Sequence, residues 1–199
     1  MDDNNITLQS YNEHVKDYVA GTPQVLDDEF EKWVDRSLKL IPKRGKVLEI
    51  GSGFGRDAIY IESLGYNVLR SDATPGFVKL LQEQGYEARH LNILTDQIDD
   101  KYDMVFAHAV FPHFKPRQLE DVLLKIHKCL KPGGVLAFSV KQGSGSEWTK
   151  IKIGAPRYFY YWSSSDDVQA LVNKTGLTVV ETTAYVSKYA NWLLVIAKK

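Results

Sequence analysis

The sequence predicts an α/β fold in which a mostly parallel β-sheet, covered by helices on both faces, ends in an antiparallel hairpin. Three observations support this prediction: short apolar runs alternate with amphipathic helical patterns, a glycine-rich turn follows the first run, and two β-rich runs close the chain. Strands and helices that alternate at this spacing form right-handed crossovers, which place helices on both faces of a parallel sheet.

The first strands are expected where β-branched and other apolar residues run almost without interruption, a pattern typical of strands that are buried on both faces. A shorter strand, YEARHLN, is expected to end at Asn92. The other four expected strands are KVLEI at 46–50, NVLRSD at 67–72, YDMVFAHAV at 102–110 and GVLAFSV at 134–140.

The segments around these strands have helical periodicity and recognisable ends. One helix is expected to begin at Arg56 and to end at Gly65, because glycine is favoured at helix C-caps. A second begins at Thr74–Pro75, where the proline suits the first turn. Further helices are expected in RQLEDVLLKIHKCLKPGG, which stops at its Pro-Gly-Gly, at 163–176, and twice within residues 10–41.

Two β-rich runs, LTVVETTAYV and NWLLVIAKK, form the C-terminal end of the pattern. They are joined by residues 187–190, a connection short enough for an antiparallel hairpin. A parallel sheet that ends in such a hairpin differs from the six parallel strands of dinucleotide-binding folds. This difference counts against a nicotinamide-dependent oxidoreductase.

Composition limits the possible functions. The chain has 199 residues, about the size of one domain, and its 25 basic residues balance 25 acidic ones. This zero net charge argues against a protein that binds nucleic acid through a bulk positive field. One cysteine excludes a disulfide framework and a cysteine-rich zinc site. No apolar stretch approaches the roughly 20 residues that cross a bilayer, and no signal peptide is recognisable, so we expect a cytoplasmic protein with no membrane partner.

The most specific local pattern is VLEIGSGFGR at 47–56. Glycines at alternate positions after a buried strand permit a tight turn and a close approach of the backbone to a ligand. The helix that follows offers unpaired N–H groups to an anion. Arg56 stands where the dinucleotide fingerprint has its third glycine, so the pattern is GxGxG and not GxGxxG.

Acidic residues at two strand ends make this turn a candidate nucleoside site. Glu49 lies in an apolar strand, where a carboxylate is costly unless it is paired, and it is expected to orient the turn or to accept from a ligand's ammonium. Asp72 ends the second strand about 20 residues after the first glycine, the position at which an acid accepts both ribose hydroxyls. The alternative is structural: both acids cap helices and the glycines form an ordinary turn.

With VLEIGSGFG, the Asp72 strand, YDMVFAHAVFPHF and LKPGGVLAFSV, the chain resembles the class I S-adenosylmethionine-dependent methyltransferases over about residues 45–199. The resemblance implies a seven-stranded Rossmann-like sheet and S-adenosyl-L-methionine as the cofactor. The segment GRDAIYIESLGYNV is similar to members that act on small molecules, such as the tellurite-resistance and thiopurine types.

The resemblance also implies residue roles. Glu49 would reach the methionine ammonium, Asp72 the ribose diol and Asn92 the adenine amino group, although Asn92 also suits a simple turn. Arg56 has no fixed role in the family; its charge suits the methionine carboxylate or solvent equally. The cofactor-binding residues implied are Tyr18, Glu49, Gly51, Ser52, Gly53, Gly55, Arg56, Asp72, Ala73, Asn92, Ile93 and His108.

Two histidines and one tyrosine complete the predicted site. His108 follows the fourth strand at the sheet edge where ligands bind, and His113 is the candidate base if the acceptor must lose a proton. The pair has no neighbouring acid and forms no obvious metal chelate. Tyr18, which shares a helical face with Tyr11, is expected to close the site, or else that helix simply packs on the sheet.

Residues 141–162 are expected to form a substrate loop, because glycines precede the aromatic cluster RYFYYW. Arg157 is expected to pair with a carboxylate or phosphate of the acceptor, and Glu147 to receive an amine or a proton. Tyr158 and Tyr161 are expected to line the acceptor pocket. The alternative is an aromatic strand that buries one face and carries Arg157 at its end. We expect a mixture of the two, in which alternate aromatic residues are buried and the others line the pocket.

These patterns predict an enzyme that methylates a small molecule on oxygen, nitrogen or sulfur. Methyl transfer is an in-line displacement, so the protein mainly binds and aligns the reactants. Rival hypotheses are a non-catalytic cofactor-binding subunit and an RNA methyltransferase, which the zero net charge disfavours. The chain is expected to be one domain, monomeric or homodimeric, with a helical cap at 1–42, a cofactor-binding core at 43–140 and a final helix and hairpin at 163–199.

Overall fold

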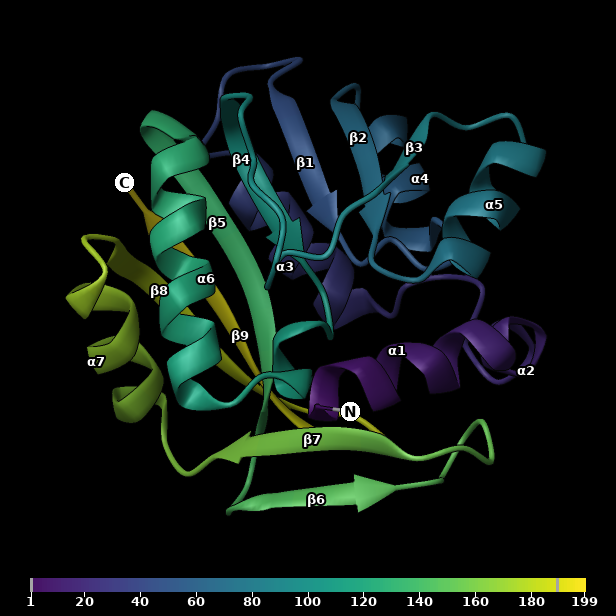
Figure 1. The fold of residues 1–199 in the computed structure, drawn as a ribbon. Coiled ribbons are helices and arrows are strands. Elements are labelled where there is room, and N and C mark those ends of the chain that lie inside the picture. The colour runs from purple at the N-terminus through teal and green to yellow at the C-terminus, as the bar shows by residue number, and fades with distance from the viewer. Residues whose placement is uncertain (1, 189) are drawn as a thin grey trace.

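A twisted sheet of parallel strands forms the centre of the protein in this computed structural model, which describes residues 2–188 and 190–199 (Figure 1). Its first five strands lie in the order β3–β2–β1–β4–β5, and all neighbours are parallel. Their bounds are β1 Lys46–Ile50, β2 Asn67–Asp72, β3 Ala88–His90, β4 Tyr102–Ala107 and β5 Leu130–Gln142.

The C-terminal strands complete the sheet in the antiparallel direction. β9 (Asn191–Lys198) pairs with β5, and β8 (Thr178–Val186) pairs with β9. The predicted seven-stranded, mostly parallel sheet with an antiparallel end is confirmed. The predicted connection at 187–190 includes residue 189, which lies outside the described residues.

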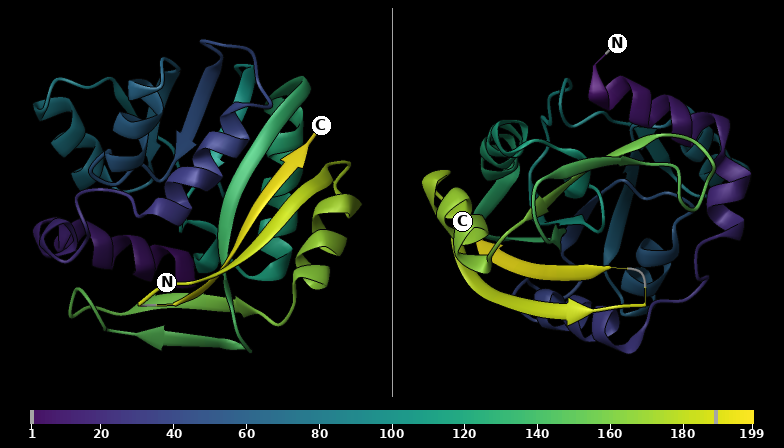
Figure 2. Two further views of the ribbon diagram at one scale, coloured as in Figure 1. Left: turned by 180° about the vertical axis from the view of Figure 1, so that it is seen from behind. Right: turned by 90° about the horizontal axis from the view of Figure 1, so that it is seen from below.

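Helices cover both faces of the sheet because its strands are apolar on both faces (Figure 2). Successive strand residues point to opposite faces, so Val105 of β4 joins one core cluster and Phe106 the other. α6 and α7 pack in the Val105 cluster, and α3 and α4 in the Phe106 cluster. These helices and α5 have the bounds α3 Asp28–Leu38, α4 Arg56–Ser63, α5 Pro75–Glu83, α6 Pro116–Cys129 and α7 Ser165–Lys174.

The N-terminal segment departs from the prediction of two helices before the first strand. It forms α1 (Asp3–Glu13), α2 (Val15–Ala20) and α3, and the helix expected to run through residues 11–21 breaks at His14, whose backbone leaves the helical region. α1 lies across the carboxyl ends of the parallel strands (Figure 1). Its early start is missed because its buried residues are polar and give no apolar periodicity.

The segment at 141–162, predicted to be a loop, is instead mostly β-structure. β6 (Ser146–Thr149) and β7 (Arg157–Trp162) form an antiparallel hairpin, and the end of β7 pairs in parallel with the tip of β5. The aromatic sequence RYFYYW therefore behaves as a strand, as its β-propensity favours. Arg157, the first residue of this strand, is buried.

Two features of the described residues bear on the predicted partners. No helix among them combines the length and apolar character needed to cross a bilayer. Nor do these residues bring three or more histidine, cysteine or acidic side chains together as metal ligands. Cys129 is a free, buried thiol in α6.

Candidate active site

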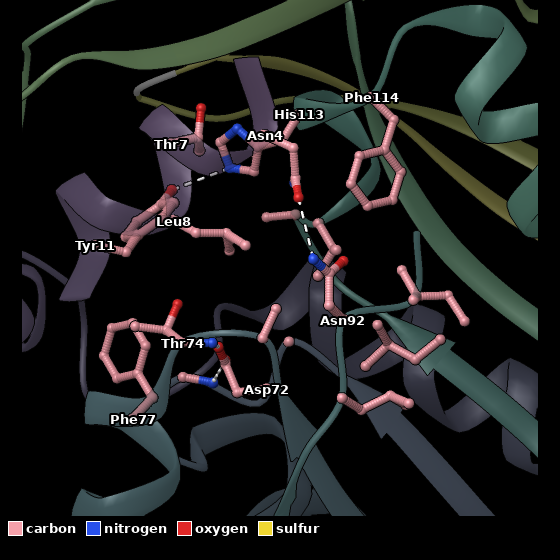
Figure 3. Close-up of a pocket in the computed structure, with 18 of the residues that line it drawn as sticks. Asn4, Thr7, Leu8, Tyr11, Asp72, Thr74, Phe77, Asn92, His113 and Phe114 are labelled. Carbon is pink, nitrogen blue, oxygen red and sulfur yellow. Dashed lines mark hydrogen bonds between the residues drawn. The ribbon is translucent and has the colours of Figure 1, made fainter. Parts of the chain in front are cut away.

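A pocket lies between α1 and the carboxyl ends of the parallel strands (Figure 3). Thr7 and Tyr11 of α1 face Asp72 and Phe77 across it, and Asn92 forms a side wall. The remaining walls are the turns that follow β1 and β4. Carboxyl ends of parallel strands are where ligands bind in open α/β folds, so this pocket is the candidate active site.

The turn between β1 and α4 has the backbone that its three glycines predict. Gly51, Gly53 and Gly55 have φ angles of +73°, +54° and +88°, in the left-handed region that favours glycine. A Cβ on Gly51 would lie 2.3 Å from the Val110 side chain. Gly51 and Gly53 line the pocket, whereas Ser52 and Gly55 lie behind it. The turn therefore presents backbone to any ligand there.

Asp72 is buried, 6% exposed, and lines the pocket. Its Oδ2 accepts from the backbone N–H of Gly53 at 2.9 Å, and its Oδ1 from that of Thr74 at 2.8 Å. Burial raises the pKa of Asp72, and these two hydrogen bonds oppose the shift. Each oxygen keeps a second lone pair, so Asp72 can fix the turn and also accept from a ligand's hydroxyl groups.

Glu49 lies beneath the glycine turn and does not line the pocket. Its side chain is 2% exposed, and its Oε2 has no hydrogen-bond partner. Burial, together with the charge of Asp57, raises the pKa of Glu49 to about 8. A buried carboxyl oxygen without a donor is unusual, and it suits a site that is completed by a cationic or N–H group.

One of the residues predicted to contact adenine, Asn92, is held in place by α1. Asn92, Ile93 and Ala73 all line the pocket. The Asn92 amide donates to the Asn4 side chain at 3.2 Å, and its Oδ1 accepts from the Leu94 N–H at 3.1 Å. Asn92 is therefore a turn residue that also faces the pocket, and its oxygen keeps one lone pair for a ligand.

Arg56 and His108 share a carboxylate that the sequence did not single out. Arg56 Nε donates to Asp57 Oδ1 at 2.7 Å, and His108 Nδ1 lies 2.6 Å from Asp57 Oδ2. Burial alone would raise the pKa of Asp57, but the charges of His108 and Arg56 lower it below its ordinary value. His108 lines the pocket and packs on Phe30, with 4.2 Å between ring centroids, whereas Arg56 does not line the pocket.

A directed hydrogen-bond chain runs from Arg157 to His113. The Tyr158 carbonyl lies 2.7 Å from His113 Nδ1, and a carbonyl only accepts, so Nδ1 carries the proton. Nε2 then accepts from the Tyr11 hydroxyl at 3.0 Å (Figure 3), while Arg157 donates to the same hydroxyl at 3.1 Å. Burial lowers the pKa of His113 to about 3. This geometry suits a neutral histidine that holds Tyr11.

Tyr11 and Tyr18 both line the pocket despite the break between their helices. Their rings meet edge to face with centroids 5.4 Å apart, and Tyr18 also contacts Phe77 at 5.3 Å. Tyr18 lies over the glycine turn, where a Cβ on Gly53 would be 3.7 Å from its ring. The sequence did not predict Tyr11 as a site residue, although Tyr11 and Tyr18 were expected to share a helical face.

The four predicted acceptor residues lie on the β6–β7 hairpin, and none of them lines the pocket itself. Tyr158 donates its backbone N–H to Thr7 of α1 at 3.1 Å, which brings this residue and Arg157 under α1. Glu147 and Tyr161 are hydrogen-bonded to each other. Arg157 and Tyr158 therefore lie near the pocket, whereas Glu147 and Tyr161 form a separate pair on the hairpin.

Comparison with known proteins decides the family. A model of the methyltransferase domain matches residues 48–136, which contain the glycine turn, Asp72 and Asn92. The predicted class I S-adenosylmethionine-dependent methyltransferase is thereby confirmed. Its cofactor is S-adenosyl-L-methionine.

Relatives of this methyltransferase differ in length and acceptor. It is 26% identical over 176 residues to phosphoethanolamine N-methyltransferase 2 of Caenorhabditis elegans, covering 80% of this chain but 40% of that relative. It shares the fold of the DhpI–SAM–HEP complex, with a TM-score of 0.77, 16% identity and coverage of 99% and 98% of the two chains. It also shares the fold of the Burkholderia thailandensis 1,6-didemethyltoxoflavin-N1-methyltransferase, solved with S-adenosylhomocysteine, with a TM-score of 0.67, 19% identity and coverage of 98% and 89%.

The pocket of this methyltransferase fits an adenosyl amino acid. Gly51 and Gly53 leave the wall free of side chains, and Asp72 keeps lone pairs for a ribose diol. The unpartnered oxygen of Glu49 matches an ammonium group beside the turn. The direct or water-mediated contacts of these residues with the cofactor remain predictions.

Proposed function

We propose that this methyltransferase transfers a methyl group from S-adenosyl-L-methionine to a small-molecule acceptor. The observation that carries the proposal is the convergence of the glycine turn, Asp72 and Asn92 on one pocket beneath α1. The bound sulfonium supplies an activated methyl group for in-line displacement. The protein has to bind both reactants, align them and exclude water.

Each part of the pocket has a proposed task. Glu49 holds the ammonium group, Asp72 the ribose hydroxyls and Asn92 the adenine edge. Tyr18, which lies over the glycine turn, covers the methionyl portion and excludes water. We assign residues 43–140 to cofactor binding and the hairpin segment 141–162 to the acceptor, because that hairpin packs under α1 beside the pocket.

Proton removal, where the acceptor requires it, falls to His108 in this proposal. Asp57 engages Nδ1 of His108, so Nε2 is the ring nitrogen that can take up a proton. His113, the base predicted from the sequence, has its Nε2 engaged by Tyr11 and is better suited to positioning that tyrosine. Replacing His108 with Asn should therefore lower kcat more than the same change at His113, measured over a pH series.

A small molecule is the preferred acceptor class for two reasons. The C. elegans and B. thailandensis relatives are named for phosphoethanolamine and 1,6-didemethyltoxoflavin, which are both small molecules. The zero net charge offers no bulk attraction for a nucleic acid. We also propose a cytoplasmic location, which the single buried cysteine supports, and a monomeric or homodimeric state.

Two measurements test the proposed function. Isothermal titration should show binding of S-adenosylhomocysteine and none of NAD. A methyl-transfer screen against a metabolite library, followed by release of S-adenosylhomocysteine, should identify an acceptor. Cofactor binding without turnover on any acceptor would favour the non-catalytic subunit, and binding of NAD in place of S-adenosylhomocysteine would refute both.

A further inference from the structure

Three cations beside the pocket, Arg157, Lys141 and Lys152, form no ion pair among the described residues. The Arg157 side chain donates to the Tyr11 hydroxyl and the Ile151 carbonyl, and its Nε is buried without any partner. The ammonium groups of Lys141 and Lys152 form no ion pair or hydrogen bond within residues 2–188 and 190–199. Arg157 is only 5% exposed, so it carries a buried charge that no carboxylate neutralises.

These cations lie on aromatic rings that connect them to the pocket. Lys152 Nζ lies 4.1 Å from the ring centroid of Tyr18, and Arg157 Cζ lies 5.4 Å from that of Tyr11. Both tyrosines line the pocket. Lys141 Nζ lies 3.7 Å from the ring centroid of Phe159, which in turn packs on the pocket residue His113 at 4.6 Å.

The three charges are close enough to repel one another. Partial burial, reinforced by the charge of Arg157, lowers the pKa of Lys141 and of Lys152 to about 8. Glu147 attracts Lys141, but its carboxylate also accepts from the Tyr161 hydroxyl. Arg157 is buried and Lys141 is half-buried, although Lys152 is exposed, so this positive charge is costly unless an anion offsets it.

The backbone at Lys152 adds a second observation. Its φ of +84° lies in the left-handed region, which is strained for a residue with a side chain. Strain of this kind persists where surrounding contacts impose it, and it is concentrated at binding and catalytic sites. This backbone lies in the turn between β6 and β7 from which the Lys152 side chain reaches the Tyr18 ring.

We propose that the acceptor carries a negatively charged group, a carboxylate or a phosphate, and that Lys141, Lys152 and Arg157 bind it. The proposal rests on the proposed methyl transfer to a small molecule and names the chemistry of that molecule. The rings of Phe159, Tyr18 and Tyr11 would otherwise suit a cationic acceptor, but the protein's own cations already lie against them. An anion is the group that this cluster attracts.

The test uses inorganic phosphate, acetate and neutral acetamide as probes. Each is titrated calorimetrically into the protein with and without saturating S-adenosylhomocysteine. We expect phosphate or acetate to bind and acetamide not to bind. The changes Lys141→Gln and Lys152→Gln should each weaken anion binding about tenfold, because each removes a charge-assisted contact. The anion that binds more tightly identifies the phosphate or carboxylate class.

Lys150→Gln is the matched control, because Lys150 is an exposed lysine of the same turn and contacts none of the three rings. Its anion affinity should equal that of the unchanged protein, and all three variants should keep their affinity for S-adenosylhomocysteine. Failure of both anions to bind, or equal losses in Lys150→Gln and Lys152→Gln, would overturn the anionic acceptor. Failure of the unchanged protein to bind S-adenosylhomocysteine would instead overturn the proposed function.

Discussion

The charged side chains on the two sides of the pocket differ in whether they have partners within the protein. On the β1–β2 side, Asp72 accepts two backbone N–H groups, and Asp57 pairs with Arg56 and His108. On the β5–β7 side, Lys141, Lys152 and Arg157 form no ion pair among the described residues and lie against aromatic rings. In our proposal the first side is preorganised before any ligand arrives, and the second is completed by the acceptor. A fixed cofactor and a variable acceptor require that division.

The largest expected effect is on the paired side. Asp72→Ala removes the acceptor of two backbone N–H groups and, in the proposed function, of the ribose hydroxyls, so affinity for S-adenosylhomocysteine should fall about a hundredfold or more. Titration calorimetry measures this loss, and a thermal melt shows whether the protein still folds. Asp72→Asn, which keeps one acceptor oxygen, should lose less. An unchanged affinity in a folded Asp72→Ala protein would show that Asp72 does not bind the cofactor.

The second effect tests the rigidity of the glycine turn. Gly51→Ala places a Cβ against Val110 in addition to the cost of a positive φ, and should destabilise the protein by about 2–4 kcal/mol. Gly65→Ala is the matched control: its φ is also positive, at +87°, but nothing lies within 4 Å of the added Cβ. It should cost only about 1 kcal/mol in denaturant unfolding. Equal losses would show that the fit against Val110 contributes nothing.

The third prediction concerns Glu49, whose Oε2 is buried without a hydrogen-bond partner. Its pKa in the folded protein, about 8, lies above the ordinary 4.5, so its contribution to stability is full below pH 4.5 and is lost as the pH rises through 8. Cofactor affinity should change in the opposite direction and rise through pH 8, because the carboxylate is the form that attracts an ammonium. Glu49→Gln should flatten both profiles, measured by melting and by titration from about pH 5 to pH 9. A variant with the unchanged protein's two profiles would exclude Glu49 as the titrating group.

We expect the smallest effect from a change at Tyr11, which contacts Arg157 on the β5–β7 side of the pocket. Tyr11→Phe removes the hydroxyl that links Arg157 to His113 but keeps the ring against Tyr18. We expect a loss of about 1 kcal/mol in stability and an altered KM for the acceptor once it is known, with cofactor affinity within about twofold of the unchanged protein. A large loss of cofactor affinity would instead place Tyr11 on the preorganised side.

The sequence predicted the regular parts of this molecule because their signals are local. Apolar strands, the glycine turn and Asp72 follow one another at fixed spacing, and the sheet that they predict is the one observed. α1 was missed in part because its buried side chains include Asn4, Thr7 and Ser10, which satisfy polar partners and do not form an apolar stripe. Burial of polar side chains depends on distant partners that no local pattern reveals.

The site was harder to predict than the sheet. Asp57 and Tyr11 act through partners that are 51 and 102 residues away along the chain, His108 and His113, so spacing alone did not mark them. Residues 141–162 were expected to be a loop because of their glycines, yet Gly145 accepts from the Tyr161 N–H in a closed hairpin. Strand pairing of this kind is decided by tertiary context more than by composition.

β5 pairs both with strands of the central sheet and with the β6–β7 hairpin. Most of its 13 residues pair with β4 and β9 in the central sheet, and its last two, Lys141 and Gln142, pair with β7. The hairpin therefore pairs with the central sheet through two residues of β5 only, while its other contacts are with α1 and the segment around His113. If the hairpin binds the acceptor as we propose, its sequence can change without altering the register of the cofactor-binding strands, provided that these contacts are kept.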